Sequence, residues 1–170
     1  NEIGPVLIEI YSARMEITNP GRPFIPTDRF IDEYQSRNER LADLMRRMGI
    51  CEEKGSGVDK VIAATEVYQL PAPDFRVGER HTTVVLFSHK PFDDMNQKDR
   101  IRACYQHCCL RYVMNERMSN QSLRDRFKLP ENKSAAVSQI IADTADLNLI
   151  KLDDAATTSR RYAKYLPFWA

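Results

Sequence analysis

The chain has 170 residues and a formal net charge of +1, with 42% hydrophobic and 29% charged residues, a length that holds one large domain or two small ones. No apolar run approaches the roughly 20 residues that a bilayer-spanning helix needs, and no signal peptide opens the sequence, so we expect no membrane partner. Residues 1–96 carry 12 Lys and Arg against 16 Asp and Glu, whereas residues 97–170 carry 13 against 8; this basic second half favours a nucleic-acid partner.

The first part of the chain predicts a hairpin followed by two helices. Residues 6–18 alternate apolar and polar side chains around a turn at Ser12-Ala13-Arg14, which is typical of two antiparallel strands. Asn19-Pro20-Gly21 predicts a turn, and Thr27 and Asp28 can cap a short helix through Tyr34. A second helix, closed by Gly49 at the usual stop position, is marked by Leu41, Leu44, Met45 and Met48.

A glycine-rich stretch, Gly55-Ser56-Gly57, precedes a predicted helix over Val58–Tyr68. The free N–H groups and partial positive charge of such a helix start favour anions, so the stretch could cradle a phosphate. Alternatively, Ser56 caps an ordinary helix and the glycines supply positive φ angles. The spacing matches neither GxGxxG nor GxxxxGK[ST] and leaves both interpretations open. The run HTTVVLF at 81–87 predicts a strand, so this half mixes helices and strands.

Residues 88–97 lose the hydrophobic periodicity and predict a linker, after which the pattern becomes helical. One helix presents a single apolar face with Cys104, Tyr105 and Cys108. A short helix that starts at Ser119-Asn120 and runs through Phe127 follows, then another from Ser134, and 149–152 with 161–166 predict a two-stranded wing. Three helices and a β-hairpin are the plan of a winged helix-turn-helix.

The strongest functional signal is the segment 120–141, in which a turn separates two helices. In a helix-turn-helix the first helix crosses the DNA backbone, and the second presents polar side chains near its start to base edges. We therefore predict DNA contacts by Arg124, Arg126, Asn132, Lys133, Ser134, Ser138, Gln139, Arg160 and Arg161, with the arginines on phosphates. A winged helix used only for protein contacts, and a solvated loop at the wing, are the alternatives.

Four cysteines, at 51, 104, 108 and 109, match neither a disulfide framework nor a CxxC pair, and they predict a reducing cytoplasm. With His107 they resemble a metal site only superficially. A helix places only Cys104 and Cys108, or Cys104 and His107, on one face, and the sequence offers no further pair of ligands. We predict buried structural cysteines, no metal, and no hydrolase centre around His81, His89 or His107.

At this point the residues resemble a known family. The stretches IEIYSARMEITNPGRP, RNERLADLMRRMGICEEKGSGVDKV and LPAPDF are similar to the C-terminal region of proteins named as RecG-like helicases or transcriptional regulators. That region is a divergent relative of the GHKL nucleotide-binding fold, and the resemblance runs over roughly residues 6–88. The second half, with MSNQSLRDRF and YLPFWA, is similar to the winged helix that follows this region in the family.

The resemblance implies a weak nucleotide-binding set of Asn19, Gly21, Gly55, Ser56 and Gly57. Asn19-Pro20-Gly21 lies where a GHKL protein has its DxGxG segment, but the Asp is replaced by Asn and the second glycine is absent. The magnesium-binding Asn of such sites lies on a helix upstream of the first strand, where this chain has not yet begun. The resemblance therefore implies at most half a site, with no cofactor for this fragment, and ATP with magnesium only in a full-length protein.

Together these observations predict an α+β protein: a partial GHKL-like α/β sandwich over 1–90, then a DNA-binding winged helix over 97–170. The function we expect is a bacterial, cytoplasmic transcriptional regulator that binds double-stranded DNA, with homodimerisation left open. The alternatives are an ATP-dependent DNA-processing protein and a winged-helix interaction module. We do not expect this fragment to be an enzyme, because helicase motors require a GxxxxGK[ST] loop and ATP hydrolysis would need an upstream segment to complete the site.

Overall fold

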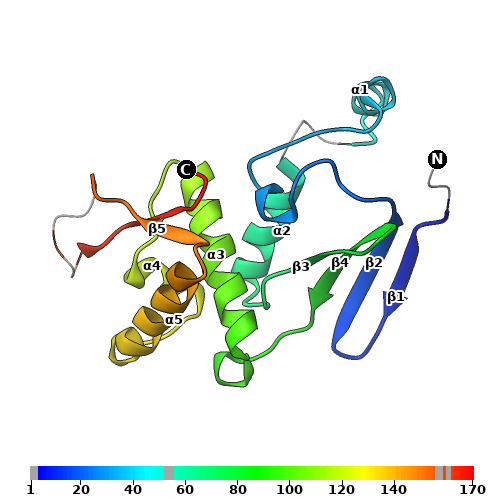
Figure 1. Ribbon diagram of the computed structural model, residues 1–170. Coiled ribbons are helices and arrows are strands. Elements are labelled where there is room, and N and C mark those ends of the chain that lie inside the picture. Colours follow the sequence, from blue (N-terminus) through cyan, green and yellow to red (C-terminus); the bar gives the residue numbers. More distant parts are fainter. Residues whose placement is uncertain (1–3, 52–55, 156–158, 160–161) are drawn as a thin grey trace.

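The computed structural model describes residues 4–51, 56–155, 159 and 162–170. It has an α+β architecture in which a four-stranded antiparallel sheet is followed by helices and a two-stranded hairpin (Figure 1). The elements in chain order are β1 (Leu7–Ile10), β2 (Arg14–Pro20), η1 (Thr27–Arg29), α1 (Glu39–Arg47), α2 (Ser56–Val67), β3 (Asp74–Val77), β4 (His81–Phe87), η2 (Phe92–Asp94), α3 (Gln97–Val113), α4 (Asn120–Arg126), η3 (Glu131–Lys133), α5 (Ser134–Asp146), β5 (Ile150–Leu152) and β6 (Tyr165–Pro167).

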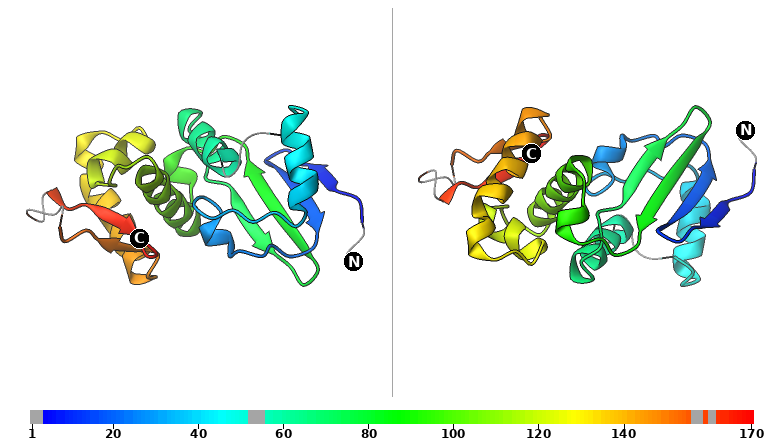
Figure 2. Two further views of the ribbon diagram at one scale, coloured as in Figure 1. Left: turned by 90° about the horizontal axis from the view of Figure 1, so that it is seen from above. Right: turned by 90° about the horizontal axis from the view of Figure 1, so that it is seen from below.

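The sheet has the strand order β1-β2-β4-β3, and each pair of adjacent strands is antiparallel. Strands β1 and β2 form the predicted hairpin, with Leu7 opposite Thr18, and β4 covers the predicted strand at 81–87. Strand β3 was not predicted, because it has only four residues and follows a proline-rich segment. Helices α1 and α2 lie over one face of the sheet, as the two views of Figure 2 show.

Two predicted helices of the first half have different outcomes. Helix α1 agrees with the prediction, and Gly49 follows it with a φ of 68°, the left-handed conformation in which glycine is favoured. The predicted helix from Thr27 to Tyr34 is wrong in extent, since only Thr27–Arg29 form a short 3₁₀ helix. The next residues are held by packing instead: Phe30 contacts the edge of Phe75 with ring centroids 5.4 Å apart, and Ile31 is buried.

Helix α3 occupies the centre of the molecule, between the sheet half and the second half (Figure 1). We predicted one apolar face, but residues 103–110 are all buried, because α3 is covered from both sides. Its side chains reach back across the predicted linker. Tyr105 donates a hydrogen bond to the Asp28 carbonyl at 2.6 Å, and Gln106 donates one to the Pro73 carbonyl at 2.7 Å. The hydrophobic core therefore continues from Ile62 on α2 into α3.

The predicted linker at 88–97 is itself structured. It contains η2, buries Met95, and brings Lys90 within 3.0 Å of Asp99 on α3. The domain boundary at 90–97 stays a prediction, but the two parts do not have separate cores among the described residues. A truncated 97–170 fragment would expose the α3 surface that packs on the first half.

The elements after α3 occur in the predicted order. Ser119 caps α4 in a reciprocal capping box with Ser122, and α5 begins at Ser134 as predicted. Strands β5 and β6 pair antiparallel, with Ile150 opposite Pro167. The second strand starts at Tyr165, four residues later than the prediction, and residues 156–158 and 160–161 lie outside the described part of the chain.

Candidate functional site

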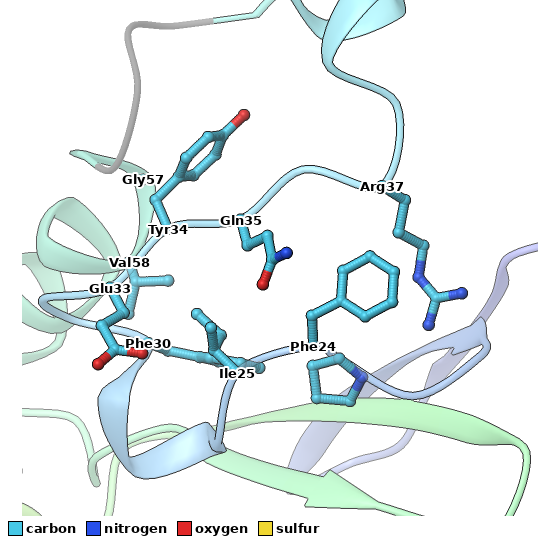
Figure 3. A pocket seen from close by; sticks show the side chains of 10 residues that line it. Phe24, Ile25, Phe30, Glu33, Tyr34, Gln35, Arg37, Gly57 and Val58 are labelled. Carbon is cyan, nitrogen blue, oxygen red and sulfur yellow. The ribbon is translucent and has the colours of Figure 1, made fainter.

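A cavity of about 410 Å³ lies where α2 begins, between its first turn and the segment at 23–37. Figure 3 shows the side chains around it, with the Arg37 guanidinium beside the Phe24 ring. Arg37 lies 4.9 Å from the centroid of that ring and donates a hydrogen bond to the Arg22 carbonyl. The cavity is mainly apolar and aromatic, and its residues are Pro23, Phe24, Ile25, Phe30, Glu33, Tyr34, Gln35, Arg37, Gly57 and Val58.

The charges around this cavity are mixed. Glu33 forms an ion pair with Arg29 at 2.9 Å, so it adds little net negative charge to the wall. Asp59, in the first turn of α2, has a buried Oδ1 with no hydrogen-bond partner among the described residues. Burial raises the pKa of the Asp59 carboxyl, and the nearby Asp32 raises that pKa further. An acidic group at the helix start opposes the binding of a phosphate there.

The weak nucleotide-binding set divides between this cavity and the sheet. Gly57 lines the cavity from inside α2, and a Cβ at that position would contact nothing within 4 Å. Gly55 lies outside the described residues, and nothing is described of the Ser56 side chain. Asn19 is exposed on β2, whereas Gly21 directly follows the strand with a φ of 95°, and its carbonyl accepts a hydrogen bond from Thr82 at 2.7 Å. Gly21 therefore serves a backbone turn.

The second candidate surface is formed where α4 and α5 begin. Asn120 joins the two helices, because its amide donates to the Ser134 carbonyl and to the Ser138 hydroxyl, both at 2.9 Å. Ser134 donates back to the Asn120 side chain at 3.1 Å. The predicted residues Asn132, Lys133, Ser138 and Gln139 are all exposed, and Ser134 is half-buried. The structure thus brings this group together at the start of α5.

The predicted phosphate contacts are not equally available. Arg126 is buried, with its Nε 3.5 Å from Glu66 and its NH2 group 2.7 Å from the Leu70 carbonyl. Arg124 is also buried, and its Nε donates to Asn120 at 3.0 Å. In this conformation neither guanidinium projects toward solvent, because each binds groups of its own chain. Arg160 and Arg161 lie outside the described residues.

A row of buried polar groups connects α2, α3 and α4. His107 Nδ1 lies 2.9 Å from Glu66 Oε1, and His107 Nε2 lies 3.2 Å from the Ser122 hydroxyl. The sequence of groups resembles a serine–histidine–acid triad. However, Ser122 is buried and its hydroxyl donates to the Ser119 carbonyl at 3.0 Å in the α4 capping box. The row therefore offers no accessible nucleophile and joins the two halves of the protein.

The cysteines of α3 are buried free thiols, as predicted, and Cys51 is an exposed one. Burial raises the pKa of Cys104 and that of Cys109 to about 12, which keeps both thiols protonated. Among the described residues no group of three His, Cys, Asp or Glu side chains could hold a metal ion. Within the same residues, none of the helices is both long and apolar enough to cross a membrane.

Several residues at these surfaces were not predicted from the sequence. The cavity depends on Phe24, Phe30 and Arg37, which come from a segment without regular periodicity. Asn120 was assigned only to the start of a helix, although its position one residue after the cap could have suggested a role in helix packing. Only the folded chain shows that these side chains converge.

Residues 4–86 match the family model described as "Putative ATP-dependent DNA helicase recG C-terminal". This segment is therefore similar to the recG C-terminal region. The match confirms the resemblance to the recG C-terminal region over the first half, and it covers β1 through nearly all of β4. The elements from α3 onward lie outside the match.

Two further comparisons do not extend this similarity to other parts of the chain. No curated protein matches the chain. The crystal structure of the DIP2311 protein from Corynebacterium diphtheriae has 10% identity and a TM-score of 0.42, over 91% of this chain and 44% of that one. The chain thus spans less than half of that protein. A similarity at this level establishes neither fold nor function.

Proposed function

We propose that this chain binds double-stranded DNA through α4, α5 and the β5–β6 hairpin, and that it belongs to a bacterial transcriptional regulator in the cytoplasm. The observation that carries the proposal is the pairing of α4 with α5 through Asn120, which leaves the start of α5 exposed. Three helices followed by a hairpin are the order of a winged helix-turn-helix, in which the second helix of the pair enters the major groove.

The exposed side of α5 suits a close approach to DNA. Ala135 and Ala136 are exposed next to Ser138, so few bulky side chains would hold the helix away from the bases. Gln139 is exposed and its amide donates to Asp143 at 2.7 Å, a bond that it would exchange for a base edge. Lys133 immediately precedes the helix and is available for a phosphate.

Arg124 and Arg126 are not available for the phosphate contacts expected of them, since their guanidinium groups form hydrogen bonds within the chain. The positive charge of the second half is also partly compensated. Arg102 pairs with Asp99 at 2.9 Å and Arg117 with Asp153 at 2.8 Å, so part of the excess charge is neutralised within the protein. Arg160 and Arg161, at the hairpin, stay in the proposal as predictions.

Fluorescence anisotropy with mixed duplexes, at several salt concentrations, tests the proposal on the whole chain. Gln139→Ala should reduce discrimination at one base pair by about 1–3 kcal/mol and leave nonspecific binding unchanged. Gln35→Ala, at an exposed glutamine outside α4, α5 and the hairpin, is the matched control. Arg160→Ala or Arg161→Ala should weaken binding to all sequences and lower the salt slope by about one each. Absence of binding at low salt would refute the proposal.

We also infer that the recG C-terminal region is a GHKL-like remnant without tight ATP binding. Asn19 replaces the expected Asp, and Asp59 places a carboxyl near the start of α2 where a phosphate would lie. Calorimetric titration with ATP and magnesium should detect no micromolar binding. Micromolar affinity that Gly57→Val abolishes would favour the ATP-dependent alternative instead.

A further inference from the structure

A second cavity, of about 380 Å³, lies between the end of α2, the segment before η2 and the turn after α4. Its wall carries three basic side chains, from His89, Lys90 and Lys128, and no acidic one. We call it the basic pocket. Tyr68, Phe92 and Phe127 supply aromatic surface beside these groups. Neither the family match nor the DNA surface of α5 includes this combination.

The basic side chains of the pocket are not all neutralised. Lys90 forms an ion pair with Asp99 at 3.0 Å. Lys128 and His89 are both exposed, and within the described part of the chain neither has an acidic partner. His89 and Lys128, two basic side chains from different segments, thus line the pocket without an acidic partner among the described residues, and this arrangement favours an anionic ligand.

The aromatic floor of the pocket is backed by two more cations. Phe92 and Phe127 meet edge to face with ring centroids 5.1 Å apart. The guanidinium of Arg100 lies 4.3 Å from the Phe92 centroid, and that of Arg126 lies 5.4 Å from the Phe127 centroid. Arg100 donates to the Phe92 carbonyl at 2.9 Å rather than to a carboxylate. The charge of the buried Arg126 is paired with Glu66, whereas the half-buried Arg100 has no carboxylate partner among the described residues and adds a positive charge beside the pocket.

The position of the pocket connects it to α5. Phe127 and Lys128 open the short turn that ends at Lys133, and Lys133 directly precedes α5. An anion held at Lys128 would therefore lie on the same turn that leads to the exposed start of α5. The backbone of a duplex that receives α5 in its major groove presents phosphates on both sides of that groove.

We propose that the basic pocket binds a backbone phosphate of the same DNA duplex that α5 contacts. This inference rests on the proposed DNA binding and adds a contact outside α5 and the hairpin. Lys128 and His89 hold the phosphate, and the aromatic floor contacts the adjoining sugar. The end of α2 thereby becomes part of the DNA-binding surface.

The test measures DNA affinity of the whole chain by fluorescence anisotropy over a salt series. Lys128→Gln should weaken binding to all duplexes alike and lower the salt slope by about one, because one phosphate contact is lost. Lys98→Gln is the matched control: Lys98 is also an exposed lysine of the second half, but it lines a different cavity next to Asp28. This variant should keep the wild-type slope.

A scan with single methylphosphonate groups then locates the contact. Neutralising one phosphate beside the α5 site should weaken wild-type binding several-fold, and the same change should have no further effect on Lys128→Gln. If the wild type binds and the α5 variants behave as proposed, but Lys128→Gln matches Lys98→Gln, the pocket inference is wrong and the proposed function stands. If the wild type binds no DNA at low salt, both are wrong.

Inorganic phosphate distinguishes a free anion from the DNA backbone. The chain has three histidines, so comparison with His89→Asn assigns the His89 ring signals in an NMR spectrum. At constant ionic strength, we expect millimolar phosphate to leave these signals unchanged and DNA to shift them. Saturable shifts by phosphate alone, lost in Lys128→Gln, would make the pocket a free-anion site and overturn the assignment to DNA.

Discussion

Helices α1 and α3 show opposite relations between sequence pattern and burial. Helix α1 separates its apolar and polar side chains clearly, yet none of its residues is buried. Leu41 and Leu44 are 50% and 53% exposed, and Met48, directly after the helix, is 63% exposed. Helix α3 has little such separation, yet nine of its residues are buried. Burial in this protein is therefore set by the place of a helix between layers and not by the strength of its amphipathic pattern.

The central helix buries polar side chains as well as apolar ones, and each of these side chains has at least one partner, although Gln106 Oε1 has none among the described residues. Asp99 is bound by Lys90 and Arg102, Gln106 binds the Pro73 carbonyl, and His107 lies between Glu66 and Ser122. Such groups are costly when a partner is removed, because the remaining one stays desolvated. We therefore expect substitutions around α3 to lower the free energy of unfolding strongly, and substitutions on α1 to change it little.

The largest effect is expected from Glu66→Ala. It leaves the Arg126 guanidinium, whose side chain is only 1% exposed, without its carboxylate, and it removes the partner of His107. We expect a loss of about 3–5 kcal/mol in the free energy of unfolding, measured with urea. Glu79→Ala, at an exposed glutamate, should change that free energy by less than about 0.5 kcal/mol.

The double variant Glu66→Ala with Arg126→Met separates the cost of an unpaired charge from lost packing. Because it removes the buried cation too, it should be more stable than Glu66→Ala alone. Equal stability of the two variants, or a loss below about 1 kcal/mol for Glu66→Ala, would mean that the α2–α3–α4 row does not hold the halves together.

Asp99→Asn should have a smaller, pH-dependent effect. Burial by itself raises the pKa of Asp99, but hydrogen bonds and charge from Lys90 and Arg102 outweigh it and lower that pKa below its ordinary value. A lowered folded-state pKa stabilises the protein above the unfolded-state pKa of about 4, and this contribution is lost as pH falls through the folded-state value.

Urea unfolding of the wild type and Asp99→Asn at several pH values measures this contribution. We expect a difference of about 1–2 kcal/mol at pH 7 that stays constant to about pH 5 and narrows below pH 4. Asp146→Asn, at an exposed aspartate of α5, provides the control. A difference that does not change with pH would assign the effect of Asp99 to packing rather than to its charge.

Cys108→Ala tests the apolar part of the α3 surface. The side chain is fully buried beside Cys104 and Cys109, so its removal leaves a small cavity and should cost about 1 kcal/mol. Cys51→Ala, at the exposed cysteine, should cost nothing measurable. In the folded wild type, a thiol reagent should modify one cysteine quickly, and rapid modification of three or four would contradict the burial of α3.

The smallest effect is expected on α1. Leu44 is 53% exposed, so Leu44→Gln should change the free energy of unfolding by less than about 0.5 kcal/mol. Thermal unfolding at two protein concentrations is the measurement. A loss above 1 kcal/mol that grows with concentration would show that α1 is buried in an assembly of chains, and the contrast with α3 would then disappear.

Local signals predicted most of the elements. The alternation at 6–18, Gly49 after α1, the cap at Ser119 and the start of α5 at Ser134 are decided by neighbouring residues, and all agree with the structure. The errors lie where distant contacts decide. The segment after Thr27 is fixed by Phe75 and by the core around Ile31, and β3 forms because β4 supplies its partner.

The sequence by itself determined most of the strands and helices, β3 excepted, and the family resemblance over the first half, because capping, turn geometry and apolar periodicity act within a few residues. Only the tertiary structure decided that α3 is buried on all sides, that Arg126 pairs with Glu66 instead of facing solvent, and that basic and aromatic side chains from three segments share one pocket. These outcomes depend on which surfaces meet when the chain folds, since a side chain gains or loses water through neighbours that lie tens of residues away.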